Sequence, residues 1–295
     1  MSGDGSLPVL VGVDGSEDGL RAVAYGARMA MAVGADLQLV HAVDDAVLAG
    51  AWGIVYDPVL LQESGKEAID EARAHALKIG IDPDRVSTSI EMGNPQAVLT
   101  KLSERAQALV VGRRALSGLE RLFVGSTSFG LANTSYCPVI MVSAATHPAH
   151  TGDKGLIGVG VDFNERSIPA LEYGFQTAKQ RSSRLLVVHA FELQSNRPDR
   201  AAREKAVHEA AEKFLQPHLE ELRAKYPEVE VQVEIVPNHP VPELTARTST
   251  VDLLVLGVHG GLPGFGPGGT VRAVMAHSDS PVALVRLKKH HEGDR

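Results

Sequence analysis

A repeat at half the chain length constrains the fold of this protein more than any other feature. Residues 9–16 read VLVGVDGS and residues 157–164 read IGVGVDFN, so that Asp14 and Asp162 stand 148 positions apart (162 − 14). A period this long is far above that of solenoid repeats, which recur every 20 to 50 residues or so. The repeat therefore indicates one complete domain that occurs twice in a chain of 295 residues.

The rest of each copy repeats in the same order. The separations are 148, 145 and 143 positions for residues 39–42 with 187–190, 108–112 with 253–257, and 137–142 with 280–285. The slow drift is what loop-length changes in a duplicated domain produce. A stretch without periodicity around residues 144–154 separates the copies. We therefore predict one domain over residues 1–146 and a second over residues 153–290.

Within each copy, short apolar runs alternate with helical patterns, which is typical of an α/β fold with a parallel sheet. Residues 229–235 alternate between valine or isoleucine and glutamate or glutamine, so the third strand has one wet face and belongs at an edge. With right-handed crossovers, five strands in the order 3-2-1-4-5 follow for each copy. The apolar fifth strands, residues 138–142 and 281–285, are expected to cover each other in an internal pseudo-dimer.

The first helix of each copy has recognisable boundary residues. Ser16 is a predicted N-cap, and Gly34 a predicted stop. In the second copy Asn164 occupies the cap position, but Pro169 moves the expected helix start to Ser167.

Composition narrows the class of function. The formal net charge is −7, which disfavours binding to nucleic acid. A single cysteine, Cys137, excludes an intramolecular disulfide and indicates a reducing compartment. The sequence shows neither a secretory leader nor a membrane-spanning apolar run, so we expect a cytoplasmic protein without a membrane partner.

The predicted strand order also locates a ligand site. The order reverses direction between strands one and four, and ligands of such sheets bind above those two carboxyl ends. Strand one of the first copy ends at Gly12 and Asp14, and strand four ends at Gly112. The next helix opens at residues 125–127, where unpaired N–H groups suit a phosphate. These positions predict a nucleotide site.

The loop after strand four carries a specific resemblance. This loop is similar to the ATP-binding signature of the universal stress protein family. The signature spacing is met by Gly112, Ala115 three positions later, and then Gly125 and Ser126 after nine further residues, with Ala115 in place of a glycine. The opening VDGS and the LVHA strand also resemble that family. The second copy has Gly257 and Gly260 but a shorter loop. The chain therefore resembles the tandem two-domain, actinobacterial-like form of the family.

The resemblance implies two tandem Rossmann-like domains that bind ATP, with Mg²⁺, and act as a nucleotide-dependent regulator of stress or dormancy rather than as an enzyme. It implies no catalytic residue and no resident metal site. The implied ATP-binding residues of the first copy are Gly12, Asp14, Ala42, Gly112, Arg113, Arg114, Ala115, Gly118, Gly125, Ser126 and Thr127. Those of the second copy are Gly160, Asp162, Ala190, Gly257, His259, Gly260, Gly261, Gly268, Gly269 and Thr270.

Several of these residues have a structural alternative. Asp14 and Asp162 could cap the following helix as readily as contact a ligand. His41 and His189, at strand ends, fit packed structural residues better than metal ligands. Cys137 fits a small buried hydrophobe.

The loop arginines fit either a solvated rim or phosphate neutralisation. They are Arg113, Arg114 and Arg121. Because the second loop offers His259 and no cation before Arg272, the first copy is expected to bind more tightly.

Two other functions stay open at this stage. One is an interaction scaffold with degenerate sites, and the other is slow ATP hydrolysis or autophosphorylation. The chain has neither a dehydrogenase fingerprint nor a P-loop. A protein partner of unknown identity and a further homodimer are also compatible with the sequence.

Overall fold

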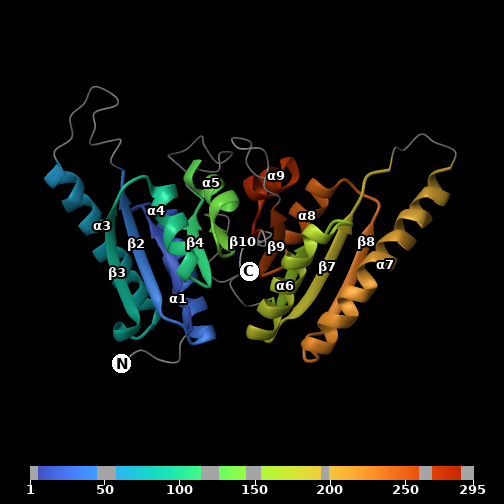
Figure 1. Ribbon diagram of the computed structural model, residues 1–295, viewed down its shortest axis with the longest axis horizontal. Coiled ribbons are helices and arrows are strands. Elements are labelled where there is room, and N and C mark those ends of the chain that lie inside the picture. The colour runs from blue at the N-terminus through green and yellow to red at the C-terminus, as the bar shows by residue number, and fades with distance from the viewer. Residues whose placement is uncertain are drawn as a thin grey trace, which may run out of the picture.

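The computed structural model describes residues 6–44, 58–113, 126–143, 154–193, 199–258 and 268–286. Within them a single sheet of ten strands crosses the molecule, with helices on both faces (Figure 1). The strand order is β3-β2-β1-β4-β5-β10-β9-β6-β7-β8.

The elements of the two copies follow the same sequence. The first copy consists of β1 (Val9–Val13), α1 (Glu17–Val33), β2 (Leu37–Val43), α3 (Pro58–Ile79), β3 (Val86–Met92), α4 (Pro95–Leu102), β4 (Ala108–Gly112), α5 (Ser126–Thr134) and β5 (Val139–Val142). The second consists of β6 (Leu156–Gly160), α6 (Ile168–Gln180), β7 (Arg184–Ala190), α7 (Arg200–Lys225), β8 (Val231–Val236), α8 (Pro240–Thr248), β9 (Leu253–Val258), α9 (Gly269–His277) and β10 (Val282–Arg286). Short 3₁₀ turns lie at Pro83–Arg85, Ser103–Arg105 and Glu165–Ser167.

Each copy has the predicted strand order 3-2-1-4-5, and every pairing within a copy is parallel. The two copies meet where β5 and β10 pair antiparallel, with Ile140 opposite Ala283 and Val139 opposite Leu284. The fifth strands thus cover each other as expected. The sequence did not predict that they would do so by hydrogen bonding, which makes one sheet of two.

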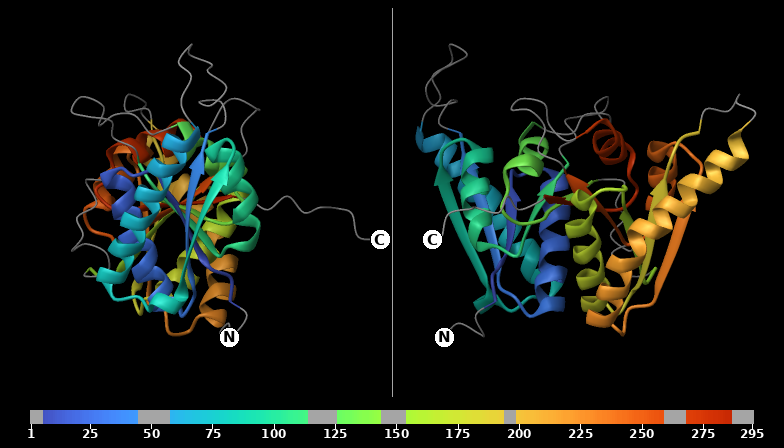
Figure 2. Two further views of the ribbon diagram at one scale, coloured as in Figure 1. Left: turned by 90° about the vertical axis from the view of Figure 1, so that its left-hand side faces the viewer. Right: turned by 45° about the vertical axis from the view of Figure 1, so that its right-hand side comes forward.

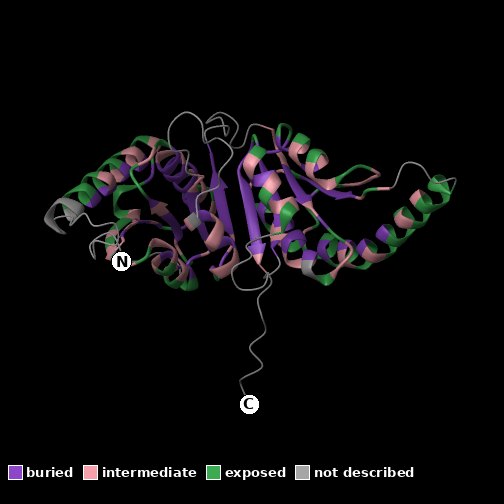
Figure 3. Ribbon diagram, turned by 90° about the horizontal axis from the view of Figure 1, so that it is seen from above, coloured by how far each residue is buried: buried purple, intermediate pink, exposed green. Residues whose placement is uncertain are grey.

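Helices cover both faces of this sheet (Figure 2), and an apolar layer lies on each face. Helices α1, α3, α6 and α7 contribute to one layer, and α4, α5, α8 and α9 to the other. Both layers continue across the β5–β10 seam, since Ile140 and Ala283 belong to the first, and Met141 and Leu284 to the second. Seen from above, the buried residues concentrate along the central strands (Figure 3).

A polar cluster also ties the copies together beside the sheet. Arg181, which ends α6, donates a hydrogen bond to the Tyr25 hydroxyl of α1 and lies 5.2 Å from the centre of that ring. Tyr173, which is 148 positions after Tyr25, lies in the same cluster. The repeat has therefore placed two equivalent tyrosines at the seam, and one arginine joins them.

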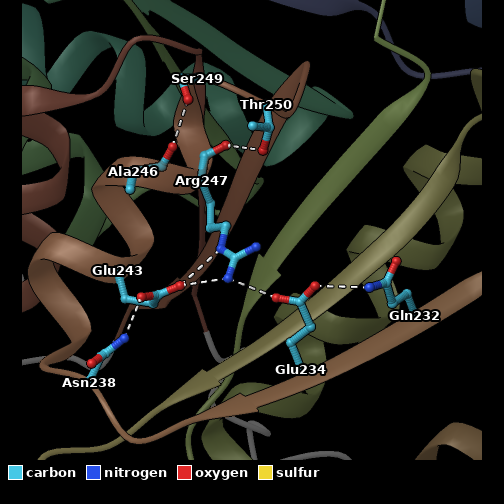
Figure 4. Close-up of polar contacts among 8 residues, drawn as sticks. All are labelled: Gln232, Glu234, Asn238, Glu243, Ala246, Arg247, Ser249 and Thr250. Atoms are coloured by element: carbon cyan, nitrogen blue, oxygen red, sulfur yellow. Dashed lines mark hydrogen bonds and ion pairs between the residues drawn. The ribbon is translucent and has the colours of Figure 1, made fainter.

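The third strands of the copies form the two edges of the sheet, as the alternating pattern predicted. On the β8 edge Arg247 of α8 binds Glu234 of β8 at 2.8 Å and Glu243 at 2.7 Å (Figure 4). The Arg247 guanidinium holds the pKa of Glu243 below its ordinary value. Charged side chains on an edge strand discourage pairing with another chain.

The first helices begin differently from each other. Ser16 caps α1, and its hydroxyl accepts a hydrogen bond from Gly19 N at 3.0 Å. Gly34 ends α1 in the left-handed region at φ 65°, as predicted. The predicted Asn164 cap is wrong, because α6 begins after Ser167, the late start that Pro169 indicated. Pro169 is confined to the first turn, where its missing N–H costs no hydrogen bond.

Candidate functional site

The carboxyl ends of β1 and β4 lie side by side, as do those of β6 and β9. Gly12 pairs with Val111, and Gly160 pairs with Leu256, in parallel register. The topology therefore places the loop after Gly12 beside the loop after Gly112 in the first copy. It places the equivalent loops after Gly160 and Gly257 together in the second.

The glycines at these strand ends have a packing reason. A Cβ on Gly112 would stand 2.6 Å from the main-chain carbon of Asp18, in the first turn of α1. A Cβ on Gly12 would stand 2.9 Å from Leu99 Cδ1, and one on Gly160 2.6 Å from Leu256 Cδ2. Contacts below 3 Å are too short for real carbon atoms. The main chain beside Gly112 cannot give way, so that position needs glycine whether or not a ligand binds, whereas the leucine side chains beside Gly12 and Gly160 would have to shift.

Asp14 fixes the turn into α1. Its Oδ1 accepts hydrogen bonds from Ser16 N at 3.0 Å and from Ser16 Oγ at 2.6 Å. Gly15 between them has φ 75°, a left-handed conformation that glycine adopts without strain. Asp14 is exposed, and its carboxylate supports the N-cap of α1.

Asp162 is held differently. Its Oδ1 accepts from Phe163 N at 2.9 Å and its Oδ2 from Asn164 Nδ2 at 2.9 Å. Its own main-chain N–H donates to Ser167 Oγ at 2.8 Å. Both carboxylate oxygens of Asp162 therefore bind the two residues that directly follow it, ahead of the 3₁₀ turn Glu165–Ser167.

His41 and His189 make the same contact in the two copies. The Nδ1 atom of each lies 2.9 Å from a carbonyl oxygen at the end of the neighbouring strand, that of Val13 or Val161. His189 is buried and stacks on Phe163, with ring centres 3.7 Å apart, and burial lowers its pKa. These contacts fit the structural role expected for both histidines.

Ala42 and Ala190 follow those histidines at the same edge of the sheet. Ala42 is half-buried and Ala190 is buried, opposite Glu91 and Val236 of the outermost strands. Both positions lie at the carboxyl end of the second strand of their copy.

The first turn of α5 is tied to the end of β4. Ser128 Oγ donates to the Gly112 carbonyl at 3.0 Å, and Thr127 is half-buried. The helix that begins at Ser126 thus starts directly above the switch point of the first copy. Unpaired N–H groups at such a helix start are donors for an anion.

The start of α9 is open. Gly268 is its N-cap, and a Cβ on Gly268 or Gly269 would have no neighbour within 4 Å among the described residues. Thr270 is half-buried beside them. These two glycines therefore lack the packing reason that explains Gly12 and Gly112, and they leave the helix start accessible.

Arg113 lies elsewhere than the sequence suggested. Its Nη1 donates to the carbonyl of Met275 in α9, across the seam, instead of remaining with the loop that follows β4. Burial lowers the pKa of this guanidinium, and the nearby carboxylates of Asp18 and Asp279 oppose that shift. Arg272, the first cation after the second loop, stacks 4.5 Å from the centre of the Phe129 ring in α5.

Asp18 is a site neighbour that sequence reasoning missed. Asp18 is 4% exposed and binds Arg21 at 2.8 Å. Burial raises the pKa of this carboxyl, and Arg21 opposes the rise. No local pattern signals this burial, because it results from packing against the end of β4 and the seam.

Cys137 is buried, as expected for a small hydrophobe. Burial raises the pKa of its thiol to about 12, so the thiolate is scarce at neutral pH. The remaining predicted site residues lie outside the described residues. They are Arg114, Ala115, Gly118, Arg121, Gly125, His259, Gly260 and Gly261, together with the side chain of Ser126.

In the described part of the chain, no group of three or more histidine, cysteine, aspartate or glutamate residues could hold a metal ion. None of the described helices is long and apolar enough to cross a membrane.

Comparison with known proteins agrees with this architecture. A universal stress protein of Mycobacterium tuberculosis is 28% identical over 96% of both chains, and one of Mycolicibacterium smegmatis is 27% identical over 94% of this chain and 96% of its own. The crystal structure of a universal stress protein from Archaeoglobus fulgidus has the same fold, with a TM-score of 0.69 at 20% identity over 97% of this chain and 98% of its own. The universal stress protein family model matches residues 7–143 and again residues 156–286. This chain therefore belongs to the universal stress protein family, in its tandem form.

Proposed function

We propose that this protein binds ATP at the switch point of its first copy and acts through the bound state as a regulator in a stress or dormancy response. The observation that carries the proposal is the junction of β1, β4 and α5. Asp14 and Gly112 lie at adjacent strand ends, and Ser128 fixes the first turn of α5 over them. A helix start at a switch point is where nucleotide phosphates bind in folds of this class.

ATP is favoured by the spacing of the following loop. Gly112, Ala115, Gly125 and Ser126 follow the family's ATP-binding signature apart from the alanine. Arg113 turns to the seam, so Arg114 and Arg121 supply the loop's positive charge in this proposal. Asp14 is an exposed carboxylate, the type of oxygen ligand that Mg²⁺ accepts when it accompanies phosphates.

Regulation rather than turnover follows from what surrounds the site. Two groups near these strand ends that could act as bases, Asp18 and His189, have pKa values that burial shifts. Both are packed against protein rather than directed at a ligand. A partner protein would then recognise the nucleotide-bound form.

The test is calorimetry with ATP and Mg²⁺ on the full chain and on the Gly125→Ala, Ser126→Ala double variant. We expect micromolar or weaker affinity for the wild type and a loss of about tenfold or more in the variant, whose thermal unfolding should be unchanged. Undiminished affinity in the variant would remove this loop from the proposal. Sustained turnover above about one per second would point to an enzyme instead.

A further inference from the structure

Two arginines cross the seam in opposite directions. Each connects the predicted nucleotide site of one copy with the helix that opens the site of the other. Arg113 runs from the first copy to α9, and Arg272 runs from α9 to α5 of the first copy. In Figure 1, α5 and α9 face each other across the centre of the molecule, at the same end of the sheet.

Arg113 is attached rigidly at its own end. It follows directly on Gly112, the last residue of β4, and its main-chain N–H donates to the Val142 carbonyl at 2.6 Å. Its guanidinium reaches the Met275 carbonyl in the last turns of α9, where a cation also interacts favourably with the helix dipole. Asp18 from the first copy and Asp279 from the second lie close enough to balance its charge.

Arg272 completes the connection from the other side. It lies in the first turn of α9, where its main-chain N–H donates to the carbonyl of the N-cap Gly268 at 3.1 Å. Its guanidinium carbon lies 4.5 Å from the centre of the Phe129 ring, within the range of a cation–π contact. Phe129 is itself three residues from the start of α5 and adjacent to Ser128, which binds the Gly112 carbonyl.

We propose that Arg113 and Arg272 are positioning residues that couple the two nucleotide sites, so that occupation of one copy changes the affinity of the other. This inference rests on the proposed function and adds a second, linked site to it. A ligand bound beyond Gly112 restrains the backbone of Arg113. Through the Arg113 side chain it also restrains the last turns of α9. A ligand at the start of α9 fixes Arg272, and with it the first turn of α5.

The packing around the seam favours the passage of a small displacement from one site to the other. The two copies share one hydrogen-bonded sheet and two continuous apolar layers, and close-packed interiors have little room to deform. Coupling between sites is reciprocal, and typical couplings change affinity about 5- to 150-fold.

Single-site variants make the coupling measurable. Gly269→Asp places a carboxylate at the start of α9, where it favours the helix and repels phosphate, and a Cβ there has no neighbour within 4 Å among the described residues. Ser126→Asp likewise places a carboxylate in the first turn of α5, where it repels phosphate. If the copies are independent, the ATP constants of these two variants together reproduce the two-site isotherm of the wild type. We expect at least one of the two single-site constants to differ by about fivefold or more from the constant that the wild-type isotherm requires.

The arginines are then tested in the same way. In the Arg113→Ala and Arg272→Ala backgrounds, the single-site constants should reproduce the two-site isotherm. Arg113→Lys, which keeps a donor for the Met275 carbonyl, should retain part of the coupling. Phe129→Leu keeps the apolar volume but removes the ring, and it should abolish the coupling as Arg272→Ala does, even if that arginine variant folds poorly.

Tyr25→Phe is the matched control. It removes the seam hydrogen bond from Arg181 without touching α5 or α9, so coupling should persist even though the seam is weakened.

Binding of a single ATP by the wild type, or constants that are independent in the wild type, would overturn the coupling and leave the proposed function intact. A coupling that survives all arginine and Phe129 variants would overturn the assignment to these residues. Absence of any ATP binding would refute the proposed function and the coupling together.

Discussion

The two copies agree in their framework and differ at the entrance to their first helix. In both, a histidine of the second strand lies 2.9 Å from a carbonyl at the end of the first strand, and in both the strand order is the same. The first copy enters its helix through left-handed Gly15 and a capping serine. The second enters through Phe163 and Asn164, which bind the two oxygens of Asp162, and then through a 3₁₀ turn.

This comparison shows which parts of a duplicated domain are constrained. Strand pairing and the histidine contact are the same in both copies, and each joins two neighbouring strands. The turn into the first helix is built from different residues in the two copies and has diverged. Function in the tandem chain is therefore expected to divide unequally between the copies, and four experiments address that expectation.

Separating the copies should have the largest effect. Residues 1–146 or 153–290 expressed alone would expose the β5 or β10 edge and the apolar residues beside it, including Ile140 and Ala283, which are fully buried in the whole chain. We expect each half to self-associate or to lose stability by several kcal/mol, measured by sedimentation and thermal unfolding. Halves that remain monomeric and as stable as the whole chain would show that the seam is dispensable.

The aspartates should separate the copies by ligand affinity. Asp14→Ala should weaken the tighter class of ATP sites about tenfold, roughly 1.4 kcal/mol, because that class is assigned to the first copy, whose loop carries Arg114 and Arg121. Asp162→Ala should leave that class unchanged, because Asp162 belongs to the second copy, whose loop carries His259 instead. The ranking of the copies is wrong if titration shows the reverse.

Substitutions at the two equivalent cap positions should reduce the stability of the protein by different amounts. Ser16 and Asn164 are 148 positions apart, but Ser16 is the N-cap of α1 and its hydroxyl accepts a hydrogen bond from Gly19 N, whereas α6 begins only after Ser167. Ser16→Ala should cost about 1 kcal/mol in denaturant unfolding, and Asn164→Ala about 0.5 kcal/mol or less. Equal losses would mean that the Asn164 side chain supports α6 by another route.

The buried histidine should give the smallest effect, visible only through pH. Because burial lowers the pKa of His189, the folded protein keeps it neutral while the unfolded chain protonates near pH 6.5. The contribution of His189 to the free energy of unfolding is then complete above about pH 6.5 and falls as the pH decreases. His189→Gln should flatten the decline in stability between about pH 7 and 5. A decline as steep as that of the wild type would assign the pH dependence to other groups.

The strand order and the sheet edges could be predicted because they depend on local patterns. Apolar runs, the alternation in β8 and the 148-residue repeat are all present in the linear sequence. The Asn164 cap failed for a local reason as well. Alignment with Ser16 suggested a cap, but Pro169 permits the helix only from Ile168 onward.

The seam contacts could not be predicted, because they join residues far apart in the chain. Proximity in sequence assigned Arg113 to the phosphate loop, yet its partner Met275 is 162 positions away. The burial of Asp18 and the pairing of Tyr25 with Arg181 arise in the same manner. A single sequence gives no signal for such long-range pairs, whereas the alternation of polar and apolar residues predicts the strands.

The antiparallel β5–β10 ladder has a consequence for how such a protein can evolve. Two separate subunits that met along this edge would be identical, and a substitution in one would appear in both. Here the partners are covalently linked, so their local concentration does not fall on dilution and each molecule contains one of each kind. A mutation in one copy therefore leaves the sequence of the other copy unchanged. The ladder thus gives the chain a permanent heterodimer, in which one copy is free to specialise while its neighbour maintains the sheet.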